Sequence, residues 1–241
     1  MGDAMKKFYY SIGEVSLTLS SLEKEKICGI SPTQENRDTE NLLFLCPSHE
    51  TDGELLFLKS APHLTAEALC TSAYHLTATR GLPLYEYTFM IDGKRYAVKV
   101  DKQNNILINI GKCKQLYSNI EISNEKYNLF ANVYALPFAC VTLAVDFVDN
   151  IDPTAFCCLL MREEKTRNLP FVLYEKGREP LHFRAFSQTA TPLANALSFH
   201  SVVATECIGK NGKLSLMDSE LTFTQNGICM KVSPKRRITL D

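Results

Sequence analysis

The chain has 241 residues, of which 45% are hydrophobic, 22% charged and 10% aromatic, so it can bury a sizeable core. Lys and Arg number 26 against 27 Asp and Glu, a formal net charge of -1, so no overall field draws the chain to nucleic acid or anionic lipid. The longest apolar run, Val133 to Val145, contains Pro137 and is shorter than the roughly 20 apolar residues of a membrane helix. We expect a globular protein with neither a nucleic-acid nor a membrane partner.

Cysteine usage points to a reducing compartment. The nine cysteines are scattered and mostly stand beside apolar residues, as in Phe156-Cys157-Cys158-Leu159. An odd count without Cys-x-x-Cys spacing predicts buried free thiols, no structural metal and a cytoplasmic protein. Residues 1–4, followed by a second methionine at Met5, are typical of a short vector-derived leader.

Hydrophobic periodicity predicts two strands, a helix and three more strands in the first half of the chain. They are expected at Leu42–Cys46, Glu54–Lys59, Thr65–Thr79 (the helix), Tyr87–Ile91, Lys94–Val100 and Ile106–Ile110. The pair Asp92-Gly93 between two of these strands is the two-residue signature of a tight hairpin.

The second half of the chain repeats this order. Its strands are expected at Phe171–Tyr174, Leu181–Phe186, Lys213–Leu216, Leu221–Thr224 and Ile228–Val232, with a helix at Ala190–Ala204 after the second strand. Since short apolar runs recur in any α+β protein, a chain without a repeat is the alternative. The matching order and turns favour a duplicated unit: two similar α+β halves, residues 5–115 and 116–241, each a mostly antiparallel sheet or barrel around a central helix, with a cleft between them.

Three segments carry a resemblance to known proteins. The segment from Ile30 to Phe44 has an acidic residue, Glu40, shortly before a buried strand. Pro62-His63-Leu64-Thr65 is similar to a Gly-His-x-Thr motif at the start of a central helix, and residues 183–196 are similar to an arginine-containing strand followed by an Asp-Pro-x-Thr-Gly-x-Ala turn. Layout and motifs resemble the diaminopimelate epimerase fold and, within it, the phenazine-biosynthesis-type isomerase family. By this resemblance Glu40 falls where that family keeps its glutamate.

Several motif positions differ from the family pattern. Gln188 stands in place of Asp, Pro192 in place of the second-motif Gly, and Pro62 in place of the Gly before the histidine. Epimerases of this fold use one cysteine at the start of each central helix, and neither corresponding segment has one here. The resemblance therefore implies an isomerase of another type than the two-cysteine racemases.

The remaining residues allow proton transfer on a carboxylate. Two helix N-termini facing one cleft favour an anion, so we expect a small carboxylate ligand and no cofactor. Glu40 is the candidate base and His63 the candidate proton or hydrogen-bond donor. The candidate substrate-binding residues are Arg184, Ser187, Thr189 and Thr191.

Each assignment has a structural alternative. Glu40 stands among polar residues and is equally consistent with a solvated turn, and His63 and the Ser187–Thr189 segment are equally consistent with helix capping. Two hypotheses follow: a cofactor-independent isomerase, or a catalytically inactive relative that serves as a ligand-binding or scaffold protein. In either case we expect a homodimer.

Overall fold

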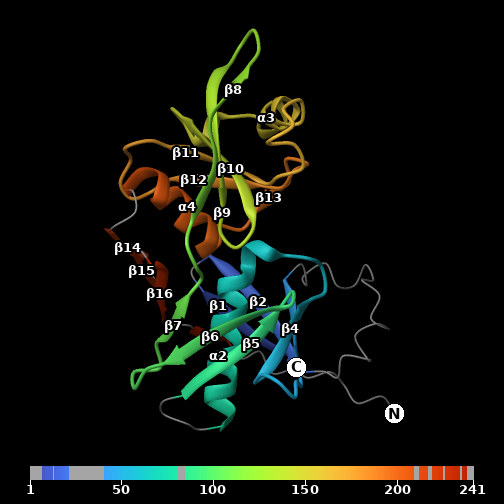
Figure 1. Cartoon of the computed structure of the whole chain (residues 1–241), viewed down its shortest axis with the longest axis vertical. Coiled ribbons are helices and arrows are strands. Elements are labelled where there is room, and N and C mark those ends of the chain that lie inside the picture. Colours follow the sequence, from blue (N-terminus) through green and yellow to red (C-terminus); the bar gives the residue numbers. More distant parts are fainter. Residues whose placement is uncertain are drawn as a thin grey trace. The chain divides into compact units, whose positions relative to one another are not determined.

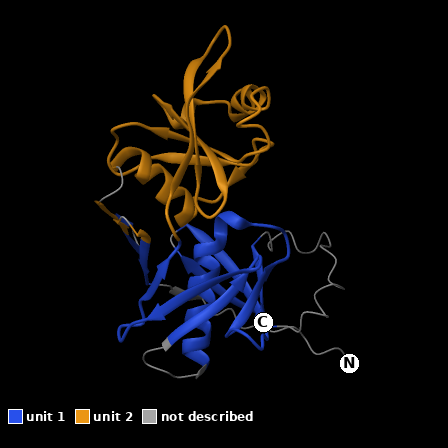
Figure 2. Ribbon diagram, in the orientation of Figure 1, with its two compact units in different colours: residues 1–110, 215–221, 229–241 blue, residues 111–214, 222–228 orange. Residues whose placement is uncertain are grey.

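The protein is described by a computed structural model that covers residues 7–12, 14–21, 41–80, 85–208, 212–216, 219–224, 226–233 and 235–237. The chain divides into two compact units (Figure 2). Unit 1 comprises residues 1–110, 215–221 and 229–241, and unit 2 comprises residues 111–214 and 222–228. Segments 215–221 and 229–241 thus belong with the first half of the chain by their contacts, although they follow the predicted boundary at 115/116.

Unit 1 is built on a sheet that has eleven strands within the described residues, in the order β14-β15-β16-β7-β6-β5-β4-β3-β2-β1-β17. Strands β14 to β16 carry residues of both units. The bounds are β1 Lys7–Ile12, β2 Val15–Ser21, β3 Leu42–Cys46, β4 Gly53–Phe57, β5 Tyr85–Ile91, β6 Lys94–Val100, β7 Ile106–Asn109, β14 Gly212–Leu216, β15 Ser219–Thr224, β16 Gly227–Val232 and β17 Lys235–Arg237.

The helix of unit 1 follows a short 3-10 turn. The turn η2 (Pro62–Leu64) leads directly into α2 (Thr65–Arg80), which contacts strands β2, β5, β6 and β7 (Figure 1). Small side chains let the strands approach closely, and Ala66, Ala68 and Ala73 are fully buried. The predicted helix at Thr65–Thr79 is confirmed.

Unit 2 has a six-stranded sheet among its described residues, in the order β13-β12-β11-β10-β9-β8. Its pairs are antiparallel except for β10 with β11. Three helical segments accompany the strands. The bounds are β8 Lys114–Ser123, β9 Asn128–Ala135, β10 Ala139–Val145, η3 Val148–Asn150, α3 Pro153–Leu160, β11 Phe171–Glu175, β12 Phe183–Phe186, β13 Pro192–Leu193 and α4 Leu197–Ile208.

Most predicted elements occur within two residues of their expected bounds, and the mixed α+β class with two sheets is confirmed. The hairpin turn between β5 and β6 is also confirmed, because Asp92 and Gly93 have φ angles of 47° and 73°, as a type I′ turn requires. The wrapping of each sheet around its helix stays a prediction. No helix within the described ranges is long and apolar enough to cross a membrane.

The predicted helix at Ala190–Ala204 is wrong at its start. Residues 187–191 form a turn in which Ala190 has a φ of 60°, outside the helical region. Pro192 lies in strand β13, which pairs with β12, and the helix begins only at Leu197. The small residues of this segment suit a helix by propensity, but strand pairing and the turn decide its conformation.

The expectation of buried thiols is only partly correct. The eight described cysteines are free, and Cys46, Cys70 and Cys140 are buried. However, Cys158, Cys207 and Cys229 are exposed. Cys229 alternates with buried neighbours on β16, where every second side chain faces outward.

Candidate functional site

The candidate base, Glu40, lies outside the described residues. The next residue is held firmly: Asn41 Nδ2 donates to the Ser16 carbonyl at 3.0 Å, and the Asn41 carbonyl accepts from the Thr18 N–H at 3.2 Å. From Leu42 onward the chain pairs in parallel with β2. The start of β3, which follows the candidate base closely in the sequence, is therefore fixed to the sheet.

His63 lies half-buried in the 3-10 turn ahead of α2. This turn is closed by the Leu64 N–H donating to the Ala61 carbonyl at 2.9 Å and by Thr65 Oγ1 donating to the Pro62 carbonyl at 2.8 Å. Burial lowers the pKa of His63 to about 4. The imidazole is therefore neutral near pH 7, with one nitrogen able to donate a hydrogen bond and the other able to accept one.

Arg184 lies on β12, opposite Leu173 of β11. Its guanidinium stands over the ring of Phe186 at 5.2 Å from the centroid. Phe186 in turn stacks on Phe171 at 5.2 Å between ring centroids. The aromatic layer thus holds a half-buried guanidinium on the sheet.

Ser187, Thr189 and Thr191 come together in one turn. Ser187 Oγ accepts from the backbone N–H groups of Thr189 at 3.2 Å and Thr191 at 3.1 Å. Ser187 Oγ and Thr189 Oγ1 are 2.9 Å apart, and Thr189 Oγ1 and Thr191 Oγ1 are 3.3 Å apart. The Ala190 N–H donates to the Ser187 carbonyl at 3.0 Å. Because this turn satisfies these three N–H groups itself, an anion meets hydroxyl groups here rather than unpaired amides.

The predicted residues thus fall into two groups. His63 belongs to unit 1, whereas Arg184 and the three hydroxyl residues follow one another along one segment of unit 2. Within the described residues no three His, Cys, Asp or Glu side chains gather as metal ligands would.

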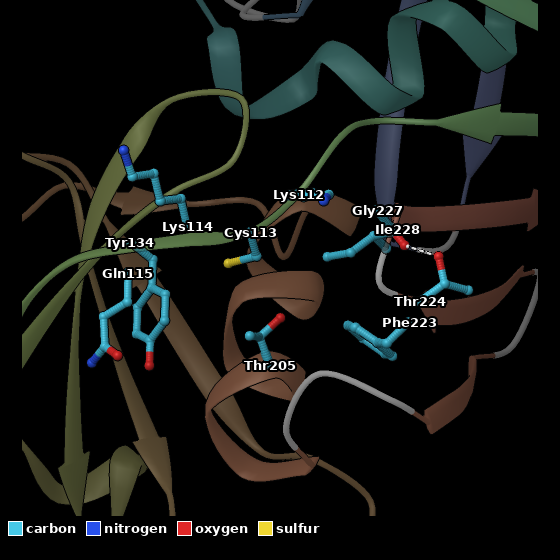
Figure 3. Close-up of a pocket in the computed structure, with 10 residues that line it drawn as sticks. All are labelled: Lys112, Cys113, Lys114, Gln115, Tyr134, Thr205, Phe223, Thr224, Gly227 and Ile228. Carbon is cyan, nitrogen blue, oxygen red and sulfur yellow. Dashed lines mark hydrogen bonds between the residues drawn. The ribbon is translucent and has the colours of Figure 1, made fainter.

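Unit 2 also contains a cavity of about 720 Å³, called here the unit 2 cavity (Figure 3). None of the five predicted site residues that the structure describes lines it. Four segments of unit 2 form its wall: residues 112–115, β9, the last turn of α4, and the end of β15 with the start of β16. Its lining residues are Lys112, Cys113, Lys114, Gln115, Tyr134, Thr205, Phe223, Thr224, Gly227 and Ile228.

A carboxylate with two donors stands next to this cavity. Glu206 on α4 accepts from Asn132 Nδ2 at 2.7 Å and from Thr142 Oγ1 at 3.3 Å. Burial, followed by this carboxylate, raises the pKa of the Tyr134 and Tyr174 phenols. The phenols therefore stay protonated, and Tyr134 brings a neutral hydroxyl group to the cavity wall.

Cys113 contributes a protonated thiol to the cavity. Burial raises its pKa to about 11, against the lowering effect of a hydrogen bond with Thr205, and the Glu206 charge raises it further. Such a thiol is a poor nucleophile. No sequence pattern indicated this cavity, because its wall joins residues that are up to 116 positions apart, from Lys112 to Ile228.

Along its whole length the chain is similar to solved structures of other proteins. A phenazine biosynthesis PhzC/PhzF protein from Clostridium difficile has a TM-score of 0.66 and 14% identity, covering 99% of this chain and 100% of that one. A predicted epimerase from Pseudomonas aeruginosa has a TM-score of 0.64 and 10% identity, with 98% and 100% covered. A hydroxyproline epimerase from Agrobacterium vitis, solved with trans-4-hydroxy-L-proline, has a TM-score of 0.56 and 7% identity, with 98% and 92% covered.

These similarities establish the fold. It is the diaminopimelate epimerase-like fold, as the motifs around His63 and Arg184 suggested. No protein-family model and no functionally curated protein matches the chain.

Proposed function

We propose that this protein is a cofactor-independent isomerase that moves a proton on a carbon atom beside a small carboxylate. The observation that carries the proposal is the fold, which the chain shares over nearly its whole length with proteins described as epimerases. In this proposal Glu40 takes the proton from carbon and returns it to another face or position, so that no other reactant is consumed.

His63 has the second role. Since burial lowers its pKa to about 4, the His63 imidazole is neutral near pH 7. A neutral imidazole in a closed turn suits hydrogen-bond donation to the oxygen on which negative charge develops as the proton leaves carbon. Of the two roles expected for His63, this state favours the hydrogen-bond donor over the acid.

Substrate orientation falls to unit 2 in this proposal. Arg184 offers a positive charge held on Phe186, and Ser187, Thr189 and Thr191 offer hydroxyl groups within one turn. A carboxylate is the group that such a set binds best. These four assignments require that the substrate carries a carboxylate.

A specific observation favours the second candidate function, an inactive relative that binds a ligand or serves as a scaffold. The backbone N–H groups of residues 189–191 are used inside their own turn, and the helix expected to begin there starts at Leu197. One of the two helix N-termini expected to bind the substrate anion is therefore not formed at this turn.

The test is carbon-bound proton exchange in heavy water, followed by NMR over a panel of amino acids, hydroxy acids and unsaturated ring carboxylates. We expect exchange with the wild-type protein and a loss of about 100-fold or more in Glu40→Gln. Glu35→Gln removes a carboxylate from the same segment and serves as the matched control. His63→Gln should lower the rate and leave the pattern of accepted substrates unchanged.

The outcomes separate the two functions. Full exchange by Glu40→Gln would overturn the assigned base but leave an isomerase. No exchange across the panel by folded wild-type protein would leave the binding or scaffold function.

We also propose that the protein is a cytoplasmic homodimer. Free cysteines, three of them exposed, support a reducing compartment. Two exposed apolar side chains on the edge strand β8 and its neighbour β9, Leu116 and Phe130, support self-association.

A further inference from the structure

We propose that the unit 2 cavity is a binding site for a small organic anion with an apolar body, bound with its charged group toward Lys112 and Lys114. This site is separate from the isomerase site, since none of its residues has a role there. Its occupation is measured by binding alone, so its test is independent of the proposed reaction.

Size and wall chemistry define the body of the ligand. A cavity of about 720 Å³ lies within the range of small-molecule sites. Phe223, Ile228 and Cys113 all line the cavity, and Figure 3 shows the side chains of Phe223 and Ile228 next to each other on one side of it. A protonated thiol, an aromatic ring and an aliphatic chain favour a nonpolar ring or short alkyl chain over a sugar or a nucleotide.

The rim of the cavity provides the positive charge. Lys112 and Lys114 flank Cys113 on the segment that leads into β8, and both are exposed. Among the residues that the structure describes, neither ammonium group forms an ion pair. A free anion can therefore bind there without displacing a protein carboxylate.

Charges elsewhere fix the orientation of the ligand. Glu206 and the C-terminal end of α4 make the side near Thr205 and Tyr134 unfavourable for a second anion. The Tyr134 hydroxyl on this side stays protonated, because burial and the Glu206 carboxylate raise its pKa. The end of the ligand away from its charge is thus neutral, and a polar group on it can hydrogen-bond to this hydroxyl.

The test uses two dyes with nearly the same aromatic body. One is 8-anilinonaphthalene-1-sulfonate, an anion, and the other is N-phenyl-1-naphthylamine, which is uncharged. We expect saturable fluorescence with the anion at micromolar concentration. The double variant Lys112→Gln/Lys114→Gln should weaken the anion about tenfold and change the affinity of the uncharged dye less than twofold.

Two further variants complete the design. Lys126→Gln/Lys165→Gln removes two exposed lysines of unit 2 that do not line the cavity, and should bind both dyes as the wild type does. Thr205→Phe places a ring in the cavity and should weaken both dyes at least tenfold. Near-ultraviolet circular dichroism confirms that each variant keeps its packing.

Protection of a native thiol provides a readout without substitutions. Because the Cys113 thiol is a poor nucleophile, labelling with iodoacetamide is run at alkaline pH for long enough to modify it without the dye. Saturating anionic dye should then slow labelling of Cys113, measured by peptide mass, and leave labelling of the exposed Cys158 unchanged. No saturable binding, no effect of the Lys112/Lys114 change, or unchanged Cys113 labelling at saturation would each overturn the proposal. Loss of binding in the lysine variant with retention in folded Thr205→Phe would place the dye on the surface and overturn it as well.

Discussion

The hydrogen bond between Tyr10 and His75 links the first strand of unit 1 to its helix. The Tyr10 hydroxyl and His75 Nδ1 are 2.7 Å apart, and the two residues are only 2% and 6% exposed. Tyr10→Phe leaves a buried ring nitrogen with one partner fewer, so we expect the free energy of unfolding to fall by about 1–3 kcal/mol. Urea denaturation measures this loss.

The neighbouring Tyr9→Phe is the control for this prediction. Tyr9 is only half-buried, and its change should stay within about 0.5 kcal/mol of the wild type. Equal stabilities of Tyr10→Phe and Tyr9→Phe would show that the bond contributes nothing net.

His63 makes a pH-dependent contribution to stability. Its pKa is lowered from 6.5 to about 4, so between these values the unfolded chain binds a proton that the folded chain does not. Its contribution is fully present above pH 6.5 and is lost as the pH falls toward 4, with a slope of up to about 1.4 kcal/mol per pH unit.

We therefore expect His63→Gln to lose less stability than the wild type between pH 6.5 and pH 4.5. Urea denaturation at several pH values gives both slopes, and His49→Gln, which replaces an exposed histidine, is the control. Parallel curves for His63→Gln and the wild type would contradict the buried, neutral imidazole on which the proposed role of His63 depends.

At the scale of elements, Glu206 ties α4 to the sheet of unit 2. Its carboxylate accepts from Asn132 on β9 at 2.7 Å and from Thr142 on β10 at 3.3 Å. A carboxylate near a helix C-terminus is unfavourable by itself, so these bonds hold it there. Glu206→Ala leaves its donors without an acceptor, and we expect a loss of about 2 kcal/mol in chemical denaturation.

Glu206→Gln removes the negative charge of this side chain and keeps its shape. It keeps one of the two acceptor oxygens and should lose about half as much stability. The exposed Glu121→Ala on β8 serves as a control and should be neutral. If Glu206→Ala were as neutral as Glu121→Ala, the network would have no structural role.

The two helices show what the sequence could and could not predict. The segment of α2 has Pro62 in the turn before it and no competing turn, so periodicity and punctuation place it correctly. The segment from Ala190 has a similar composition. However, the Ser187 hydroxyl accepts hydrogen bonds from the backbone N–H groups of Thr189 and Thr191, and Pro192 lies in strand β13. Hydroxyl-to-backbone bonds compete with helix formation, and a single sequence does not show which one wins.

At the scale of the whole molecule, local motifs predicted the fold better than the sites. The order of the elements and the short motifs can be read directly along the sequence, and they indicated the fold that the solved structures share. The unit 2 cavity joins four segments, from Lys112 to Ile228, and only tertiary packing brings them together. The hydroxyl residues at 187–191 could be grouped in advance because one turn holds all of them.

The last prediction concerns assembly. Strand β8 ends the strand order of unit 2, so among the described residues one of its edges has no partner strand. Leu116 on β8 and Phe130 on β9 are 40% and 58% exposed. Unpaired edges with apolar side chains associate readily, and a second copy of the same strand closes such an edge symmetrically.

We therefore expect sedimentation at twice the chain mass of 27.1 kDa. Leu116→Lys/Phe130→Lys should shift the protein to monomer, since it places one lysine on the edge strand β8 and a second charge on the neighbouring strand β9, where apolar side chains are exposed. Phe147→Lys replaces another exposed aromatic residue of unit 2, 66% exposed, and should leave the dimer intact. A wild-type monomer would contradict the homodimer itself, whereas a dimer that survives the double change but not Phe147→Lys would move the interface away from β8.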